Sequence, residues 1–242
     1  MSFHYEERLS DSPHIRTIWQ TQSDGDGCYL AVADGSWDLL VVRRGGEVRV
    51  EVAGPATRVA PIVYHQGTNY LGIRFAVGTF MPHLPPGHLV DEVLVLRKAT
   101  SESFWLDDTV SRIPEYEHVE TFVARLARGR LLVRDEAVQA VVQGDPSALS
   151  PRSVQRHFVR ATGLTQAAHR QIERARRAAD LLRAGVPILD AVHALGYADQ
   201  AHLTRALKRH CGRTPAWIAR AYAPEGPSRL VPAEQISGSR AP

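Results

Sequence analysis

Two segments of the chain carry the same residue pattern at a fixed separation. The segment "LSPRSVQRHFVRATGLT" (149–165) aligns without a gap with "ADQAHLTRALKRHCGRT" (198–214) at a shift of 49 residues. Arg156 of the first copy matches Arg205 of the second. An ungapped internal repeat predicts that one small structural unit occurs twice in the chain.

Each copy has the signals of a short helix with two different faces. Ser150 and Asp199 are suited to cap the two helices, and Pro151 is suited to the first helical position. The apolar positions at helical spacing are Val154, Phe158 and Ala161 in the first copy, and Leu203, Leu207 and Cys211 in the second. The opposing faces carry Arg152, Gln155, Arg156 and Val159, and Ala201, Thr204, Arg205 and Lys208. Each helix is therefore expected to bury one stripe and to expose a cationic, hydrogen-bonding one.

The exposed faces have the chemistry of base recognition in DNA. Arginine bonds guanine in a bidentate manner, glutamine bonds adenine, and an Ala or Thr methyl contacts the thymine methyl. The stretch 188–207, "ILDAVHALGYADQAHLTRAL", has the helix, glycine turn and helix of a helix-turn-helix. A helical hairpin with a solvated arginine face is the competing interpretation, and the second copy of the exposed pattern argues against it.

The charge of the chain is concentrated around the repeat. The 242 residues carry a net charge of +3, but residues 151–220 hold 13 Lys and Arg against 4 Asp and Glu. Residues 1–114 hold 10 against 14, so the excess positive charge belongs to the repeat region. A basic block of this kind favours a polyanionic partner, although a solvated basic face has the same composition.

The residues after 180 also resemble a known family. The stretch 181–218, "LLRAGVPILDAVHALGYADQAHLTRALKRHCGRTPAWI", resembles the C-terminal signature of the AraC/XylS-family transcription regulators. The resemblance covers about 135–222 and implies two helix-turn-helix units joined by a linker helix over 165–184. Carried over by position, it assigns DNA contacts to Arg152, Ser153, Gln155, Arg156, Gln200, Ala201, Thr204 and Arg205, and the exposed face adds Lys208.

The two copies differ in the segment before the recognition helix. A support helix is predicted over 187–196, but Gly144, Asp145 and Pro146 occupy part of the corresponding region of the first copy. Proline inside a helix removes a hydrogen bond and clashes with the preceding turn. The sequence therefore predicts that the first support helix, within 134–144, is truncated or replaced.

The N-terminal half has the pattern of an antiparallel β domain. Strands are predicted at 37–44, 47–54, 58–65, 69–77 and 89–96, with a proline-containing loop at 81–88. Gly45 and Gly46, between the first two strands, indicate a tight hairpin. By resemblance, such a domain before this DNA-binding module senses a small molecule or mediates dimerisation. The aromatic residues considered for a ligand pocket, with the hydrophobic core as their alternative place, are Trp19, Tyr29, Trp37, Tyr64 and Phe75.

The predicted fold class is α+β. It comprises a mostly antiparallel β domain (1–113), a helical connector (114–134) that contains the helix expected at 114–129, the all-α double helix-turn-helix domain (135–222) and a disordered tail (223–242). Further helices are expected at 165–185 and 214–222.

Other functional classes have little support in the sequence. No HExxH, CxxC, GxSxG, P-loop or GxGxxG motif occurs, so neither a metal site, a cofactor nor catalytic residues are expected. His157 and His210 are interpreted as helix-surface residues or phosphate contacts. Two distant cysteines, and the lack of a signal peptide or a long apolar run, indicate the cytoplasm and no membrane association.

The expected function is an activator or repressor of transcription. Its expected partners are double-stranded promoter DNA, with RNA polymerase and a small-molecule effector as further candidates, and the chain acts as a monomer or homodimer. The alternatives are a small-molecule-binding or enzymatic β domain with an attached helical module, and a non-specific nucleic-acid-binding protein.

Overall fold

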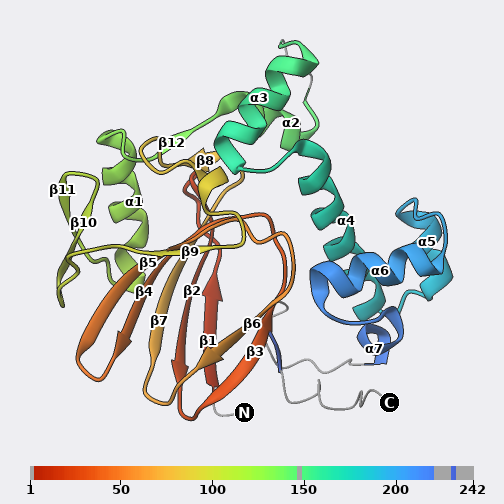
Figure 1. Ribbon diagram of the computed structural model, residues 1–242, viewed down its shortest axis with the longest axis horizontal. Coiled ribbons are helices and arrows are strands. Elements are labelled where there is room, and N and C mark those ends of the chain that lie inside the picture. Colours follow the sequence, from red (N-terminus) through yellow and green to blue (C-terminus); the bar gives the residue numbers. More distant parts are fainter. Residues whose placement is uncertain (1–2, 146–148, 221–229, 233–242) are drawn as a thin grey trace. The chain divides into compact units, whose positions relative to one another are not determined.

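The computed structural model describes residues 3–145, 149–220 and 230–232, and these form two compact units (Figure 1). The first unit comprises the described residues up to 25, 35–55 and 65–166. The second comprises 26–34, 56–64 and the described residues from 167 onward. Two β segments of the N-terminal half therefore belong with the C-terminal helices. The domain boundaries expected from the sequence pattern stay a prediction.

The first unit is built on a six-stranded antiparallel sheet, as Figure 1 shows. The strand order is β1-β2-β7-β4-β5-β9, and neighbouring strands pair in antiparallel fashion. The strands are β1 (Phe3–Arg8), β2 (Ile15–Ser23), β4 (Asp38–Arg44), β5 (Glu47–Ala53), β7 (Asn69–Phe75) and β9 (Val93–Val95). The predicted antiparallel β domain is confirmed.

The tight hairpin predicted at the two glycines joins β4 to β5. Arg44 pairs with Glu47, so Gly45 and Gly46 form the two-residue turn. Their φ angles are 57° and 85°, which glycine adopts without steric cost. Along β5, Val50 and Val52 are buried, as the alternation of valine with charged residues predicts.

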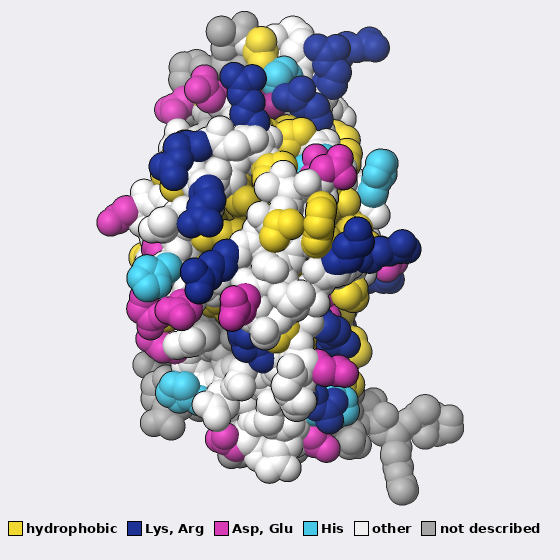
Figure 2. All heavy atoms as spheres, turned by 90° about the vertical axis from the view of Figure 1, so that its left-hand side faces the viewer, with side chains coloured by type: hydrophobic (Ala, Val, Ile, Leu, Met, Phe, Trp, Pro, Cys, Tyr) yellow, Lys and Arg dark blue, Asp and Glu magenta, His cyan; other side chains and the backbone are white. Residues whose placement is uncertain are grey.

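A hydrophobic core lies between the sheet and the helix α1 (Val119–Arg128), which follows a short 3-10 turn, η2 (Tyr116–His118). Phe122 of α1 is buried, and its ring centroid lies 6.1 Å from that of Phe104. Phe104 belongs to the hairpin of β10 (Ser103–Leu106) and β11 (Thr109–Arg112), which lies beside α1 (Figure 1). On this side of the molecule, exposed hydrophobic side chains lie among Lys and Arg (Figure 2).

Several strands were not expected, and β2 shows why. Its sequence, IRTIWQTQS, lacks an alternation of apolar and polar residues. Thr17 and Thr21 are nevertheless buried, at 4% and 6% exposure, so threonines occupy positions where the pattern requires apolar side chains. The pairing of β2 with β1 and β7 therefore depends on tertiary contacts rather than on periodicity.

The helices follow the order predicted from the sequence. They are α2 (Glu136–Gln143), α3 (Pro151–Thr162), α4 (Gln166–Arg183), α5 (Ile188–Ala194), α6 (Gln200–Cys211) and α7 (Pro215–Arg220). The α+β class, with a β-rich part followed by helices, is confirmed. Before α2, β12 (Val133–Arg134) pairs with β8 (Thr79–Phe80), and a 3-10 turn, η1 (Pro86–His88), follows β8.

A smaller sheet belongs to the second unit. It has the order β13-β3-β6, with β13 (Leu230–Pro232), β3 (Gly27–Ala31) and β6 (Ala60–Tyr64). The tail predicted at 223–242 contains β13 and otherwise lies outside the described residues.

The end of α3 is packed unusually closely. Gly163 ends the helix with φ 72°, and a Cβ at this position would lie 2.7 Å from the backbone nitrogen of Gly87 in η1. Gly144 ends α2 with φ 82°, but a Cβ there would meet no atom within 4 Å. The two glycines therefore share a backbone conformation and differ in their surroundings.

We predict that Gly163→Ala destabilises the protein more than Gly144→Ala. Both substitutions place alanine in the left-handed region, at a cost of about 1–2 kcal/mol. Only Gly163→Ala adds a clash with the backbone of η1, which costs about a further 1–3 kcal/mol. Urea unfolding followed by tryptophan fluorescence measures the difference, and equal midpoints for the two variants would contradict the close contact between α3 and η1.

Candidate nucleic-acid interface

The first candidate recognition helix is α3, and its start follows the sequence signals. The side chain of Ser150 accepts a hydrogen bond from the Ser153 backbone N–H, and Pro151 occupies the first turn. The apolar stripe of Val154, Phe158 and Ala161 is buried, as predicted. The predicted DNA contacts Arg152, Gln155 and Arg156 are exposed, whereas the Ser153 hydroxyl accepts a hydrogen bond from that of Ser150.

The second candidate recognition helix is α6. Asp199 caps it by accepting a hydrogen bond from the His202 backbone N–H, and the stripe of Leu203, Leu207 and Cys211 is buried. The predicted contacts Gln200, Ala201, Arg205 and Lys208 are exposed. The half-buried Thr204 donates its hydroxyl to the Gln200 carbonyl oxygen. Its methyl group is thus the part left for an apolar contact.

The basic side chains on these two exposed faces have no partner in the part of the chain that the structure describes. Within residues 3–145, 149–220 and 230–232, no ion pair or hydrogen bond engages the side chains of Arg152, Arg156, Arg205 or Lys208. By contrast, Arg176 of α4 pairs with Glu173 at 2.7 Å. The unpaired cations are available to bond guanine or phosphate without first breaking a contact.

The predicted contacts fall into two groups. The set on α3 lies in the first compact unit, and the set on α6 lies in the second. Within each set the side chains share one helix face, as their spacing requires. Their roles in DNA contact stay a prediction.

The support helix of the first copy is displaced rather than truncated. α2 has eight residues and α5 has seven. With the shift of 49, α5 corresponds to 139–145, whereas α2 occupies 136–143. Gly144 ends α2 in the left-handed conformation, and the Asp145 N–H bonds the Ala140 carbonyl oxygen. Of the two predicted alternatives, truncation is therefore wrong, whereas a helix in a shifted position agrees with replacement. Pro146, which motivated the prediction, lies outside the described residues.

The connection to the recognition helix differs in length between the copies. Residues 144–150 link α2 to α3, and residues 195–199 link α5 to α6. The first connection is thus two residues longer than the second.

A buried carboxylate joins α2 to α3. Asp135 caps α2 by accepting hydrogen bonds from the Ala137 and Val138 N–H groups. It also accepts hydrogen bonds from His157 Nδ1 at 2.8 Å and from Arg160 Nη2 at 3.1 Å. Burial by itself raises the pKa of Asp135, but the hydrogen bonds outweigh it and hold the pKa below its usual value. His157 is therefore an internal contact, and the role of Asp135 was not predicted from the sequence.

The turn between α5 and α6 is stabilised by an aromatic contact. The guanidinium carbon of Arg174 in α4 lies 4.3 Å from the ring centroid of Tyr197, which follows Gly196. Tyr197 also makes an edge-on contact with the His202 ring, at 5.1 Å between centroids. Cation–π attraction of this kind ties the linker helix to the turn that precedes the recognition helix. The contact between Arg174 and Tyr197 was not predicted from the sequence.

The carboxyl end of α6 is capped by the small sheet of its own unit. The Val59 N–H donates to the Arg209 carbonyl oxygen at 3.0 Å, and the Ala33 N–H donates to that of His210 at 2.8 Å. These carbonyl groups have no partner inside the helix, so strand-flanking amides supply them. His210 is 6% exposed, and its Nδ1 bonds the Thr57 carbonyl oxygen at 2.8 Å. The expected surface or phosphate role of His210 is therefore wrong.

The aromatic residues considered for a ligand do not gather at one site. Trp37 and Phe75 stack in the core of the first unit at 4.0 Å between ring centroids, and Trp19 stacks on Tyr5. Tyr29 and Tyr64 contact each other in the second unit. Three of the five thus belong to one unit and two to the other.

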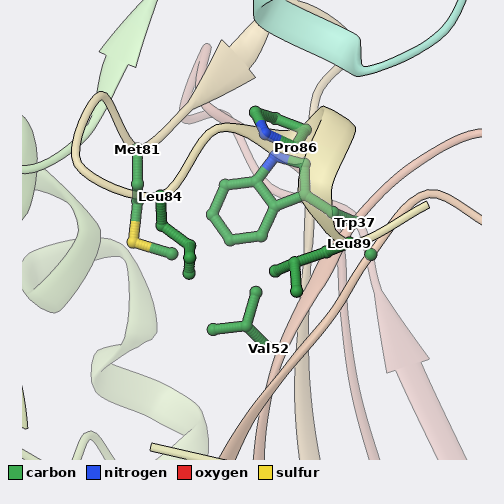
Figure 3. A pocket seen from close by; sticks show the side chains of 7 residues that line it. Trp37, Val52, Met81, Leu84, Pro86 and Leu89 are labelled. Carbon is green, nitrogen blue, oxygen red and sulfur yellow. The ribbon is translucent and has the colours of Figure 1, made fainter. Parts of the chain in front are cut away.

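Trp37 alone of these five lines a small pocket in the first unit. Figure 3 shows its indole beside Pro86, with Leu84 and Leu89 across the space. The space between these side chains has room for about one water molecule, far less than a small-molecule ligand needs. The lining is apolar, and the indole N–H is already bonded to the Thr79 carbonyl oxygen at 2.7 Å.

Two further features are absent from the described residues. Among them, no group of three or more His, Cys, Asp or Glu side chains is placed to hold a metal ion. No helix in the same part of the chain is long and apolar enough to cross a membrane.

Burial raises the pKa of the Cys211 thiol to about 11, so this cysteine is protonated and unreactive near neutral pH.

We predict that His210 makes the second unit less stable in mild acid. Burial lowers the pKa of His210 below its ordinary value. The neutral form of His210 therefore contributes stability that is fully present above the unfolded pKa of about 6.5 and is lost as the pH falls from that value through the lower pKa of the folded state. Thermal unfolding between pH 8 and 5.5 should show a smaller loss of Tm for His210→Asn, which keeps an N–H donor for Thr57 but does not titrate.

The matched control for this prediction is His193→Asn. His193 lies exposed on α5 in the same unit, so its variant should lose as much Tm on acidification as the unaltered protein. An identical pH dependence for His210→Asn and the unaltered protein would show that buried His210 does not set it.

Comparisons with known proteins agree with this geometry. The family model described as "Helix-turn-helix domain" matches residues 146–221. The chain is similar to the HTH-type transcriptional regulator RipA of Corynebacterium diphtheriae, with 41% identity over 28% of this chain and 20% of that protein. It is also similar to RipA of Corynebacterium glutamicum, with 33% identity over 37% of this chain and 28% of that protein.

These relatives are matched over a small part of their length, and no solved structure matches the chain. The matched segment contains both candidate recognition helices and the linker helix between them. Residues 146–221 therefore form a helix-turn-helix domain of the AraC/XylS type.

Proposed function

We propose that this protein is a sequence-specific DNA-binding regulator of transcription that inserts α3 and α6 into the major groove. The observation that carries the proposal is the pair of helices with buried backs, whose exposed faces carry basic side chains that have no partner among the described residues. The helix-turn-helix match and the similarity to RipA support the same function.

The composition of the exposed faces favours sequence-specific recognition over non-specific binding. α3 offers Arg152, Gln155 and Arg156, and α6 offers Ala201 and Arg205. These residues differ in the base edges that they recognise, whereas a binder of phosphates alone needs only positive charge. The basic side chains and the amides at the helix starts would contact phosphates and fix the register.

The first unit is our candidate for control of DNA binding. α3 belongs to this unit, and Gly163 at its end packs against η1, the turn that supplies Pro86 to the small pocket. An effector at this pocket would have to be apolar and to widen the space between the side chains, because the lining side chains are apolar and the space is small. The proposal also includes contact of the DNA-bound protein with RNA polymerase, and dimerisation of the chain, as ways in which it regulates transcription.

Selection of binding sites tests the proposed function directly. The full chain is incubated with a library of random-sequence duplexes, and the recovered sequences are compared after several rounds. A shared motif that binds more tightly than its scrambled version supports the proposal. Recovery without sequence preference, together with a steep dependence of affinity on salt, would instead identify a non-specific nucleic-acid-binding protein.

We predict that Arg205→Ala weakens binding to the selected duplex and relaxes selectivity at one base pair. The loss of one bidentate contact with guanine costs about 1–3 kcal/mol. Fluorescence anisotropy with the selected duplex, and with duplexes altered at single positions, measures both effects.

Arg125→Ala is the control for the loss of one exposed arginine. Arg125 lies exposed on α1, outside the proposed interface, and its variant should bind with unchanged selectivity. If Arg205→Ala behaves as Arg125→Ala does, then α6 does not read bases through Arg205.

A further inference from the structure

Asp135 connects three parts of the first unit through its backbone and its carboxylate. Its side chain is 3% exposed. The backbone N–H of Asp135 donates to the Gly78 carbonyl oxygen at 2.9 Å, next to β8. The carboxylate caps α2 through the Ala137 and Val138 N–H groups and also bonds two side chains of α3. One residue thus fixes the β region, α2 and α3 to one another.

We define the Asp135 cluster as Asp135, His157 and Arg160. His157 Nδ1 and Arg160 Nη2 both bond the same carboxylate oxygen, at 2.8 and 3.1 Å. The Arg160 guanidinium also lies over the ring of Phe80 in β8, at 5.6 Å from its centroid. His157 and Arg160 lie about one helical turn apart on α3, so their bonds to Asp135 restrain the rotation of the helix about its axis.

The second copy has no counterpart of this cluster. The shift of 49 places Ala184, Ala206 and Arg209 at the positions of Asp135, His157 and Arg160. Instead, α6 is held at its carboxyl end by the Val59 and Ala33 amides. The sequence repeat therefore extends to the exposed faces and not to the contacts that orient the helices.

Because the connection in the first copy is longer, the Asp135 cluster has to supply more of the restraint on the angle between α2 and α3. Residues 144–150 separate α2 from α3, whereas residues 195–199 separate α5 from α6. A longer connection restricts the angle between two helices less than a short one. Side-chain contacts must then supply part of the restraint on α3, and a buried carboxylate with four donors supplies a directional one.

We propose that Asp135 is a positioning residue for DNA recognition by the first helix-turn-helix: it fixes the orientation in which α3 presents Gln155 and Arg156. This role rests on the proposed function, because it acts through the contacts of α3 with DNA. Asp135 itself is buried and does not touch DNA. Asparagine at this position keeps one acceptor oxygen, which can still cap α2, but its NH2 group cannot accept hydrogen bonds from His157 and Arg160, so α3 loses its set orientation.

Hydroxyl-radical footprinting of the full chain on the selected duplex tests this role. Arg156→Ala and Arg205→Ala first identify the parts of the site that α3 and α6 protect. Asp135→Asn should lose the α3 part and keep the α6 part, with about a tenfold loss of affinity, which is about 1.4 kcal/mol. Glu136→Gln is the matched control, because it makes the same change at an exposed position one residue further on.

Two results would overturn the positioning role. One is an unchanged footprint for Asp135→Asn, and the other is an equal loss of protection in both parts of the site. A merely structural role predicts the second result, because general destabilisation does not distinguish α3 from α6. If the unaltered chain selects no motif, the proposed function fails first, and the role of Asp135 fails with it.

A second pair of variants decides the question if Asp135→Asn does not fold by circular dichroism. His157→Asn places an amide N–H donor near the position of Nδ1, whereas His157→Ala removes the donor. Protection of the α3 part by His157→Asn, and its loss in His157→Ala, supports the positioning role. Equal footprints for these two variants would contradict it.

Discussion

Each of the two candidate recognition helices, α3 and α6, buries one apolar stripe and exposes the opposite face, and the rest of the C-terminal structure depends on this constraint. Phe158 of α3 is packed with Phe80 and Val138 of the first unit. Leu203 and Leu207 of α6 are packed with α4 and α5 of the second. Burial of such side chains contributes roughly 1.5–3 kcal/mol each, more than any surface contact on these helices. The free faces are therefore held by their buried backs.

The same exposed pattern is supported by two different sets of contacts. The Asp135 carboxylate restrains α3, whereas amides that flank β3 and β6 cap the end of α6. The segments that contain β3 and β6 come from the N-terminal half but belong to the second unit. A conformational change in the segments of β3 and β6 would therefore act on α6 through the hydrogen bonds of its last carbonyl groups. A conformational change at η1 or Asp135 would instead act on α3.

Local sequence signals were sufficient wherever structure depends on neighbours in the chain. Ser150 and Asp199 cap their helices, and Gly45 and Gly46 form the expected turn. These features depend on capping, helical period and backbone conformation, all of which a few residues encode. The local sequence signals failed for β2, where buried threonines hide the alternation of apolar and polar residues. They also failed for His210, whose burial depends on Thr57, far away in the sequence.

The sequence by itself determined the two helices, their apolar stripes, the residues on their exposed faces and the likeness of one copy to the other. Only the tertiary structure decided how each helix is held, because this depends on contacts between residues far apart in the chain. Asp135 meets His157 and Arg160 only after α2 and α3 pack together. The Val59 and Ala33 amides reach α6 only when β3 and β6 join the second unit. Periodicity records which side of a helix is buried, but it does not record the partner that covers it.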